Sequence, residues 1–118
     1  MAILSIILQI LLGIGFIFFG LAKFTSPDMV EGFKHFGYPG WFRIFTGTVE
    51  MSAAVLILIG IWQSQLAAVG GLLIVLTMIG AIFTHIKIKD TIQGMMMPII
   101  LLLLGSTVLL INFPQLFG

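Results

Sequence analysis

The sequence predicts an all-α integral membrane protein: a four-helix bundle with a short interfacial helix between its first and second spans. Of the 118 residues, 60% are hydrophobic and only 8% are charged, and the mean hydropathy is +1.27. Soluble domains carry about 25% charged residues, and a small domain buries only part of its surface. Four stretches are also close to the roughly 20 apolar residues that cross a bilayer. We therefore expect a single domain over residues 1–118 with the lipid bilayer as its main partner.

The first span is expected over residues 2–22. No basic residue precedes Lys23, and the apolar run is longer than the 7–15 residues typical of a signal peptide, so we expect a retained helix. The segment Ser26-Pro27-Asp28 then predicts the start of a new helix. An apolar stripe opposite a polar face indicates that this helix lies at the membrane interface. The stripe is Val30, Phe33 and Phe36, and the polar face is Glu31, Lys34 and His35.

The remaining three spans are expected over residues 41–61, 66–86 and 95–113. The break between the second and third spans is the short uncharged segment Gln63-Ser64-Gln65, which predicts an antiparallel hairpin. The break between the third and fourth spans, residues 87–94, carries charge. Pro98 lies inside the fourth span, where it predicts a kink or a first-turn position.

The basic residues predict how the bundle is oriented. With four spans, the first and third breaks lie on the same side of the membrane, and all five basic residues lie in or beside them. The positive-inside rule places these charged loops in the cytoplasm and both termini outside, in a multi-pass protein of the inner or plasma membrane. The basic residues are Lys23, Lys34, Arg43, Lys87 and Lys89.

Several classes of function are excluded or disfavoured. The chain has no cysteine, which excludes disulfide exchange and thiolate ligands of its own. His35 and His85 lie on different elements without metal-ligand spacing, so we expect neither a metal site nor haem. A net charge of +1 gives no basis for binding nucleic acid.

Glu50 is the most informative residue, because it lies inside the second span. A carboxylate within the membrane costs a few kcal/mol on insertion scales, so it normally faces a partner or a water-filled cavity. Lys23 and His85 approach the same membrane side, and we expect the three to converge. Glu50 and His85 are candidate catalytic residues, because a histidine can shuttle protons near neutral pH. The alternative is that Glu50 is a structural ion-pair partner that locks helix packing.

Four further residues are candidate ligand-binding residues. Thr46 lies one turn before Glu50, and Thr84 lies beside His85 on a small, polar helix face. Lys23 ends the first span, where it could also simply extend its charge to the headgroups. Met97 belongs to a run of three methionines, which could line a pocket for a flat ligand or serve only as adaptable filler.

The order of these motifs resembles the DoxX-like family of small bacterial membrane proteins over nearly the whole chain. The matching segments are Gly20-Leu21-Ala22-Lys23-Phe24, Phe36-Gly37-Tyr38-Pro39, Gly47 with Glu50, Gly80-Ala81 and Thr84-His85. The resemblance implies a four-helix bundle and links to quinone and thiol redox stress, with a quinone as the implied ligand. Other relatives act in receptor assembly, so the resemblance leaves the activity open.

Three hypotheses follow. The first is a membrane component of quinone-related redox metabolism or detoxification, in which a cofactor or partner subunit supplies the electrons. The second is a non-catalytic assembly factor or small-molecule binder that packs against partner helices or forms a homo-oligomer. The third is a small transporter, for which the uncharged half of the bundle offers few polar side chains.

Overall fold

A computed structural model describes residues 2–117, and these residues form the expected all-α architecture. Four helices are long and apolar enough to span a membrane. A short helix lies between the first two spans, as predicted. The elements are α1 (Ala2–Thr25), α2 (Pro27–Phe36), α3 (Gly40–Ile59), α4 (Ser64–Lys87), α5 (Ile92–Asn112) and the 3₁₀ turn η1 (Phe113–Leu116).

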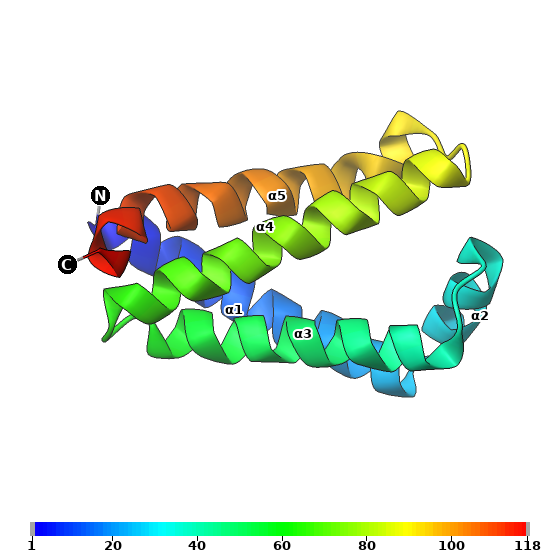
Figure 1. Ribbon diagram of the computed structural model, residues 1–118, viewed down its shortest axis with the longest axis horizontal. Coiled ribbons are helices and arrows are strands. Elements are labelled where there is room, and N and C mark those ends of the chain that lie inside the picture. The colour runs from blue at the N-terminus through cyan, green and yellow to red at the C-terminus, as the bar shows by residue number, and fades with distance from the viewer. Residues whose placement is uncertain (1, 118) are drawn as a thin grey trace.

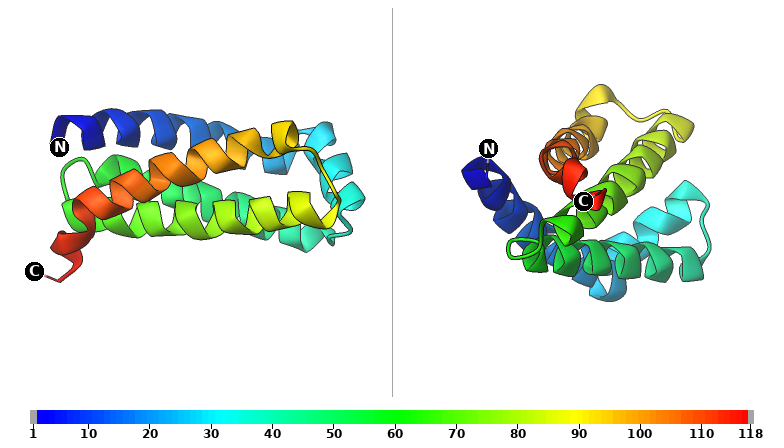
Figure 2. Two further views of the ribbon diagram at one scale, coloured as in Figure 1. Left: turned by 90° about the horizontal axis from the view of Figure 1, so that it is seen from above. Right: turned by 60° about the vertical axis from the view of Figure 1, so that its left-hand side comes forward.

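The bundle consists of two helix pairs that meet at one end and spread apart at the other (Figure 1). Helix α1 packs along α3, and α5 packs along α4, while α3 and α4 join the two pairs. Both termini lie at the narrow, uncharged end, and α2 and the α4–α5 turn lie at the wide end. The right-hand view of Figure 2 shows the same divergence. The wide end carries the charged residues, so charge and open space coincide.

Glycines allow the paired helices to approach closely. A Cβ atom on Gly47 of α3 would lie 3.1 Å from the Cβ atom of Lys23 and 3.3 Å from the carbonyl oxygen of Gly20 on α1. In the other pair, a Cβ on Gly71 of α4 would lie 3.2 Å from the carbonyl oxygen of Gly105 on α5. Small residues at helix contacts are typical of membrane bundles, whose helices associate through close packing.

The narrow end is packed and closed. Apolar side chains from all four long helices meet there, and Leu12, Phe16 and Ile57 are almost fully buried. A buried polar chain crosses this core, in which Asn112 Nδ2 donates to Ser5 Oγ at 2.9 Å. Ser5 Oγ donates to Gln9 Oε1 at 2.8 Å, and Gln9 Nε2 donates to the carbonyl oxygen of Ile57 at 2.9 Å. These hydrogen bonds tie α1, α3 and α5 together.

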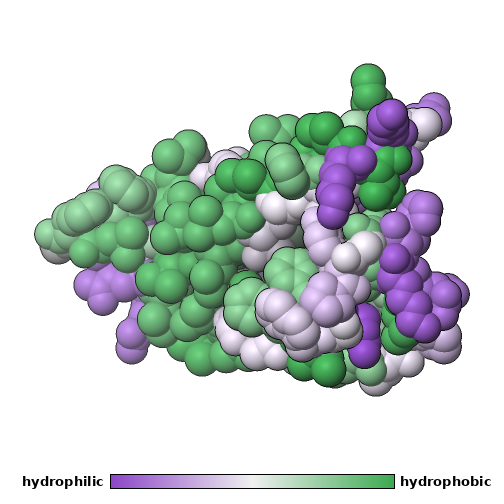
Figure 3. Space-filling model, turned by 45° about the vertical axis from the view of Figure 1, so that its right-hand side comes forward, coloured by the Kyte–Doolittle hydropathy of each residue, from purple (hydrophilic) through white to green (hydrophobic). Residues whose placement is uncertain are grey.

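The outer surface fits a bilayer. Large apolar side chains are exposed along all four long helices. In the space-filling view, hydrophobic residues cover most of the visible face, and hydrophilic residues gather mainly at the wide end (Figure 3). Trp41 lies in the first turn of α3 at the wide end, and Trp62 lies in the α3–α4 turn at the narrow end; both are exposed. Tryptophans at both ends match the aromatic belts of membrane proteins.

Candidate functional site

A cavity of about 700 Å³ lies at the wide end, lined by α2, α3, α4, Tyr38 and Lys23 of α1. Its volume falls within the range of about 300–1,000 Å³ typical of small-molecule sites. Its walls are mainly aromatic and aliphatic, and a few polar side chains interrupt them. The aromatic lining residues are Phe33, Phe36, Tyr38, Phe42, Phe45 and Phe83.

An ion pair between Lys23 and Glu50 lies at the edge of this cavity. Lys23 Nζ is 2.5 Å from Glu50 Oε1, and the side chains are 12% and 2% exposed. Because side chains tilt toward the N-terminus of their helix, Lys23 on α1 and Glu50 on the antiparallel α3 lean toward each other. The close contact of Gly20 with Gly47 brings the two backbones near enough for the pair to form. The sequence-based expectation that Lys23 accompanies Glu50 is thus met by the geometry.

The Glu50 carboxylate keeps free hydrogen-bonding capacity. Although Lys23 is close, Oε1 accepts no hydrogen bond of regular geometry from the described residues. The contact is an ion pair, and Oε1 keeps an acceptor position for a further donor. A carboxylate has about four such positions, and burying them without donors is unfavourable. Arg43 holds the backbone of α1 beside the pair, since its Nη1 donates to the carbonyl oxygen of Lys23.

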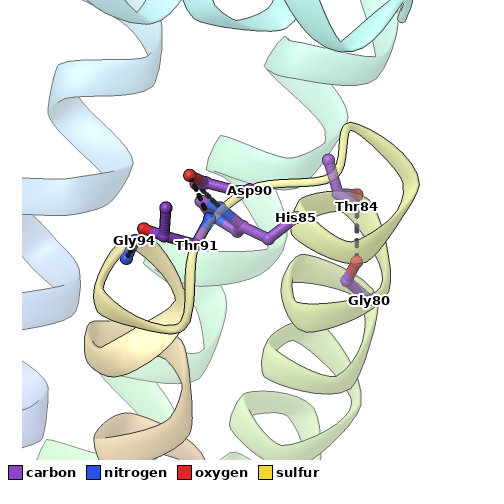
Figure 4. Close-up of polar contacts among 6 residues, drawn as sticks. All are labelled: Gly80, Thr84, His85, Asp90, Thr91 and Gly94. Atoms are coloured by element: carbon purple, nitrogen blue, oxygen red, sulfur yellow. Dashed lines mark hydrogen bonds and ion pairs between the residues drawn. The ribbon is translucent and has the colours of Figure 1, made fainter.

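Thr84 and Tyr38 connect opposite walls of the cavity. The Thr84 hydroxyl donates to the carbonyl oxygen of Gly80 one turn earlier at 3.0 Å (Figure 4). Tyr38 Oη lies 2.7 Å from the same hydroxyl. Because a threonine hydroxyl has one hydrogen, both bonds form together only with Tyr38 as the donor in the second. The loop after α2 is thereby attached to α4.

His85 pairs with Asp90 rather than with Glu50. His85 Nδ1 lies 2.7 Å from Asp90 Oδ2, within the turn that leads to α5 (Figure 4). Asp90 also accepts from the backbone N–H of Thr91 at 2.8 Å. The hydrogen bond with His85 and then that from Thr91 hold the pKa of Asp90 below its usual value. His85 still lines the cavity, so Glu50 and His85 face one space without touching.

Five of the six candidate site residues line the cavity: Lys23, Thr46, Glu50, Thr84 and His85. Met97 does not. It lies on α5, outside the lining, and is 55% exposed. Whether any of these residues acts on a ligand is not tested by their position, so their roles stay predictions.

Sequence reasoning did not anticipate the site roles of Tyr38 and Asp90. Tyr38 was not among the candidate site residues, but it lies in the cavity wall and bonds to Thr84. A signal was available, since Tyr38 belongs to the Phe36-Gly37-Tyr38-Pro39 motif. Asp90 follows His85 by five residues. Residues at this spacing are not neighbours on a helix face, so the sequence did not indicate that they are in contact.

The end of α4 contacts α2 and Tyr38 beside the cavity. Phe33 of α2 is buried against the bundle. Lys87 Nζ lies 4.9 Å from the centre of the Tyr38 ring, and it donates to the carbonyl oxygen of Phe36 at 3.4 Å. Over residues 2–117, no group of three or more potential metal-ligating side chains comes together.

Comparisons with known proteins give a family but no activity. A sequence model described as the DoxX-like family matches residues 7–108. An uncharacterized protein of Bacillus subtilis (strain 168), YdgD, is 35% identical over 83 residues, which cover 70% of this chain and 73% of the relative. No solved structure matches the chain significantly.

Proposed function

Because the chain belongs to the DoxX-like family and is a multi-pass membrane protein, we propose that it binds a quinone-class ring in the wide-end cavity. In this role it serves quinone-related redox metabolism or detoxification. The observation that carries the proposal is the combination of an aromatic-walled cavity of about 700 Å³ with a buried ion pair at its edge. Flat rings pack well on aromatic walls, and a few fixed polar groups then orient the ligand.

The polar groups are suited to the oxygens of such a ring. The Lys23 ammonium can donate to a ring oxygen, and the Glu50 carboxylate can accept from a ring hydroxyl. His85, on the opposite wall, is a candidate proton carrier between the cavity and the charged end, with Asp90 fixing its orientation. The cavity lies at the end that the positive-inside rule assigns to the cytoplasm.

The electrons of any quinone chemistry must come from elsewhere. Interconversion of a quinone and a hydroquinone moves two electrons and two protons, and the chain has no cysteine to exchange them. A bound cofactor or a partner subunit would supply the reducing equivalents. On this proposal the chain itself binds the ring, orients it and moves protons.

The packed narrow end favours a binding protein over a pore. A conducting path would have to continue from the cavity to the end where the termini lie. There Leu12, Phe16, Ile57 and Ile74 fill the interior, and the polar chain of Ser5, Gln9 and Asn112 satisfies its own hydrogen bonds.

Two glycine variants provide a matched test of ligand binding. Gly80 lines the cavity, and a Cβ there would meet nothing within 4 Å. Gly15 on α1 has equally open surroundings but does not line the cavity. We expect Gly80→Phe to abolish binding of tetramethylbenzoquinone and its hydroquinone by protein in lipid nanodiscs, and Gly15→Phe to preserve it. Equilibrium dialysis against empty nanodiscs measures the difference. Failure of the unmodified protein to bind either form would refute the proposal.

A further inference from the structure

The hydrogen-bond inventory of the cavity is dominated by acceptors. Thr46 Oγ1 donates its one hydrogen to the carbonyl oxygen of Phe42 at 2.8 Å, and Thr77 Oγ1 donates to that of Leu73 at 2.7 Å. Thr84 donates to Gly80, and Tyr38 therefore donates to Thr84. Each hydroxyl donates its hydrogen to a protein acceptor, so only its lone pairs are left for a ligand.

The histidine adds another acceptor. Its Nδ1 faces the Asp90 carboxylate at 2.7 Å, and a carboxylate only accepts. When the ring is neutral, this contact places its hydrogen on Nδ1 and leaves a lone pair on Nε2. With His85 neutral, Lys23 is the lining side chain that retains N–H groups beyond those committed to protein partners.

Glu50 makes the demand for a donor strongest. Its side chain is 2% exposed, and Oε1 accepts no regular hydrogen bond from the described residues. A carbonyl oxygen placed between Lys23 and Glu50 would satisfy only the ammonium and would put a lone pair against the carboxylate. A hydroxyl oxygen can accept from the ammonium and donate to the carboxylate at the same time.

From this inventory we propose that the cavity selects a neutral aromatic ring with a free hydroxyl group, as in a hydroquinone or phenol, over the corresponding quinone. The ligand hydroxyl bridges Lys23 and Glu50, and the ring packs against the aromatic wall. The inference rests on the proposed function, because it names which form of a quinone-class ring the site holds more tightly. Tighter binding of the reduced form makes the bound quinone easier to reduce than the free one.

Charge argues for a neutral ligand. The ammonium of Lys23 already neutralises Glu50 at 2.5 Å. Lys87 lies over the ring of Tyr38, which lines the cavity, so a second positive charge is close by. An organic amine would satisfy the acceptors, but its charge would be repelled by both ammonium groups.

Binding of three matched ring compounds tests the inference. The probes are tetramethylhydroquinone, tetramethylbenzoquinone and the dimethyl ether of the hydroquinone, measured without oxygen by equilibrium dialysis against protein in nanodiscs. They share one methylated ring, and only the hydroquinone can donate. We expect it to bind about tenfold or more tightly than either other probe, since a site that leaves a buried polar group unpaired rejects the analogue strongly.

Variants connect the preference to the ion pair. The double variant Lys23→Met/Glu50→Leu removes both charges together and should lower the preference to less than about threefold while the ring still binds. Glu31→Gln is the control for Glu50→Gln, because Glu31 lies exposed on α2 and outside the cavity. It should leave the preference unchanged, whereas Glu50→Gln should weaken it.

The outcomes separate the two proposals. Equal binding of all three probes, tighter binding of the quinone, or a preference that survives in the double variant would overturn the inference and leave the proposed function standing. Binding of none would refute the proposed function itself. Tighter binding of phenyltrimethylammonium than of the hydroquinone would also overturn the inference, because it would show a site for cations.

Discussion

Removing either member of the buried Lys23–Glu50 ion pair should destabilise the bundle, but by different amounts. Lys23→Met leaves the Glu50 carboxylate without its cation, and Glu50→Leu leaves the Lys23 ammonium without its anion. The two residues differ in their access to water. Glu50 is 2% exposed and lies ten residues into α3, about 15 Å from the helix start at 1.5 Å per residue. Lys23 is 12% exposed and lies two residues before the end of α1.

These positions set the expected magnitudes. Breaking a buried ion pair by removing one partner destabilises a protein by about 3–5 kcal/mol. We expect that full loss for Lys23→Met, because the Glu50 side chain is too short to reach the interface. For Glu50→Leu we expect about 1–3 kcal/mol, because the flexible lysine stem can carry the ammonium outward. The double variant should lie within about 1 kcal/mol of the unmodified protein, since two apolar side chains replace both charges.

Reversible unfolding in mixed detergent and SDS micelles, followed by circular dichroism, gives the free energy of unfolding for all four proteins. The double-mutant cycle then yields the coupling between the two positions. A double variant as unstable as the sum of the single variants would show that the pair is not coupled. A larger loss for Glu50→Leu than for Lys23→Met would contradict the assigned difference in access to water.

Three further predictions concern packing and the α4–α5 turn. Gly71→Ala should lower the free energy of unfolding by about 1–3 kcal/mol in the same assay, because its Cβ would press on the α5 backbone at 3.1 Å. Gln9→Leu should cost about 0.6–2 kcal/mol and leave ring binding unchanged, because its hydrogen bonds lie at the narrow end. Asp90→Asn should destabilise the turn at pH 7, as measured by amide exchange. Hydrogen bonds with His85 and from Thr91 lower the folded pKa of Asp90. Its contribution to stability is therefore complete above the ordinary pKa of 3.8 and is lost as the pH falls from that value through the lower folded pKa.

The architecture could be predicted because membrane insertion depends mainly on the summed hydrophobicity of each stretch of about 20 residues. Four apolar runs of sufficient length predicted the spans. The concentration of charge in two breaks predicted which helix ends lie on the same side of the membrane. The helix ends were less accessible. Helix α1 continues to Thr25, past the charged Lys23, and α5 begins at Ile92. A backbone stays helical beyond the apolar segment when a neighbour such as Arg43 satisfies its terminal carbonyl groups.

The candidate site could be predicted only in part. An intramembrane carboxylate demands a partner, and Lys23 and His85 both approach the same membrane side, so a pairing with one of them followed from elementary electrostatics. The structure pairs Glu50 with Lys23. The partner of His85 did not follow, because Asp90 reaches it through a turn in which Lys89 has φ 58°. Met97 was placed by its chemistry alone, and helix rotation directs it away from the cavity.

An experimental structure of the protein crystallised from a lipid phase with tetramethylhydroquinone would test the central claim most directly. The claim is that the wide-end cavity holds an aromatic ring whose hydroxyl meets the Lys23–Glu50 pair. We predict density for the ring between α2, α3 and α4, with one ring oxygen within hydrogen-bond distance of both Lys23 Nζ and Glu50. A cavity filled only by lipid chains, or a Glu50 side chain turned outward into the bilayer, would contradict it.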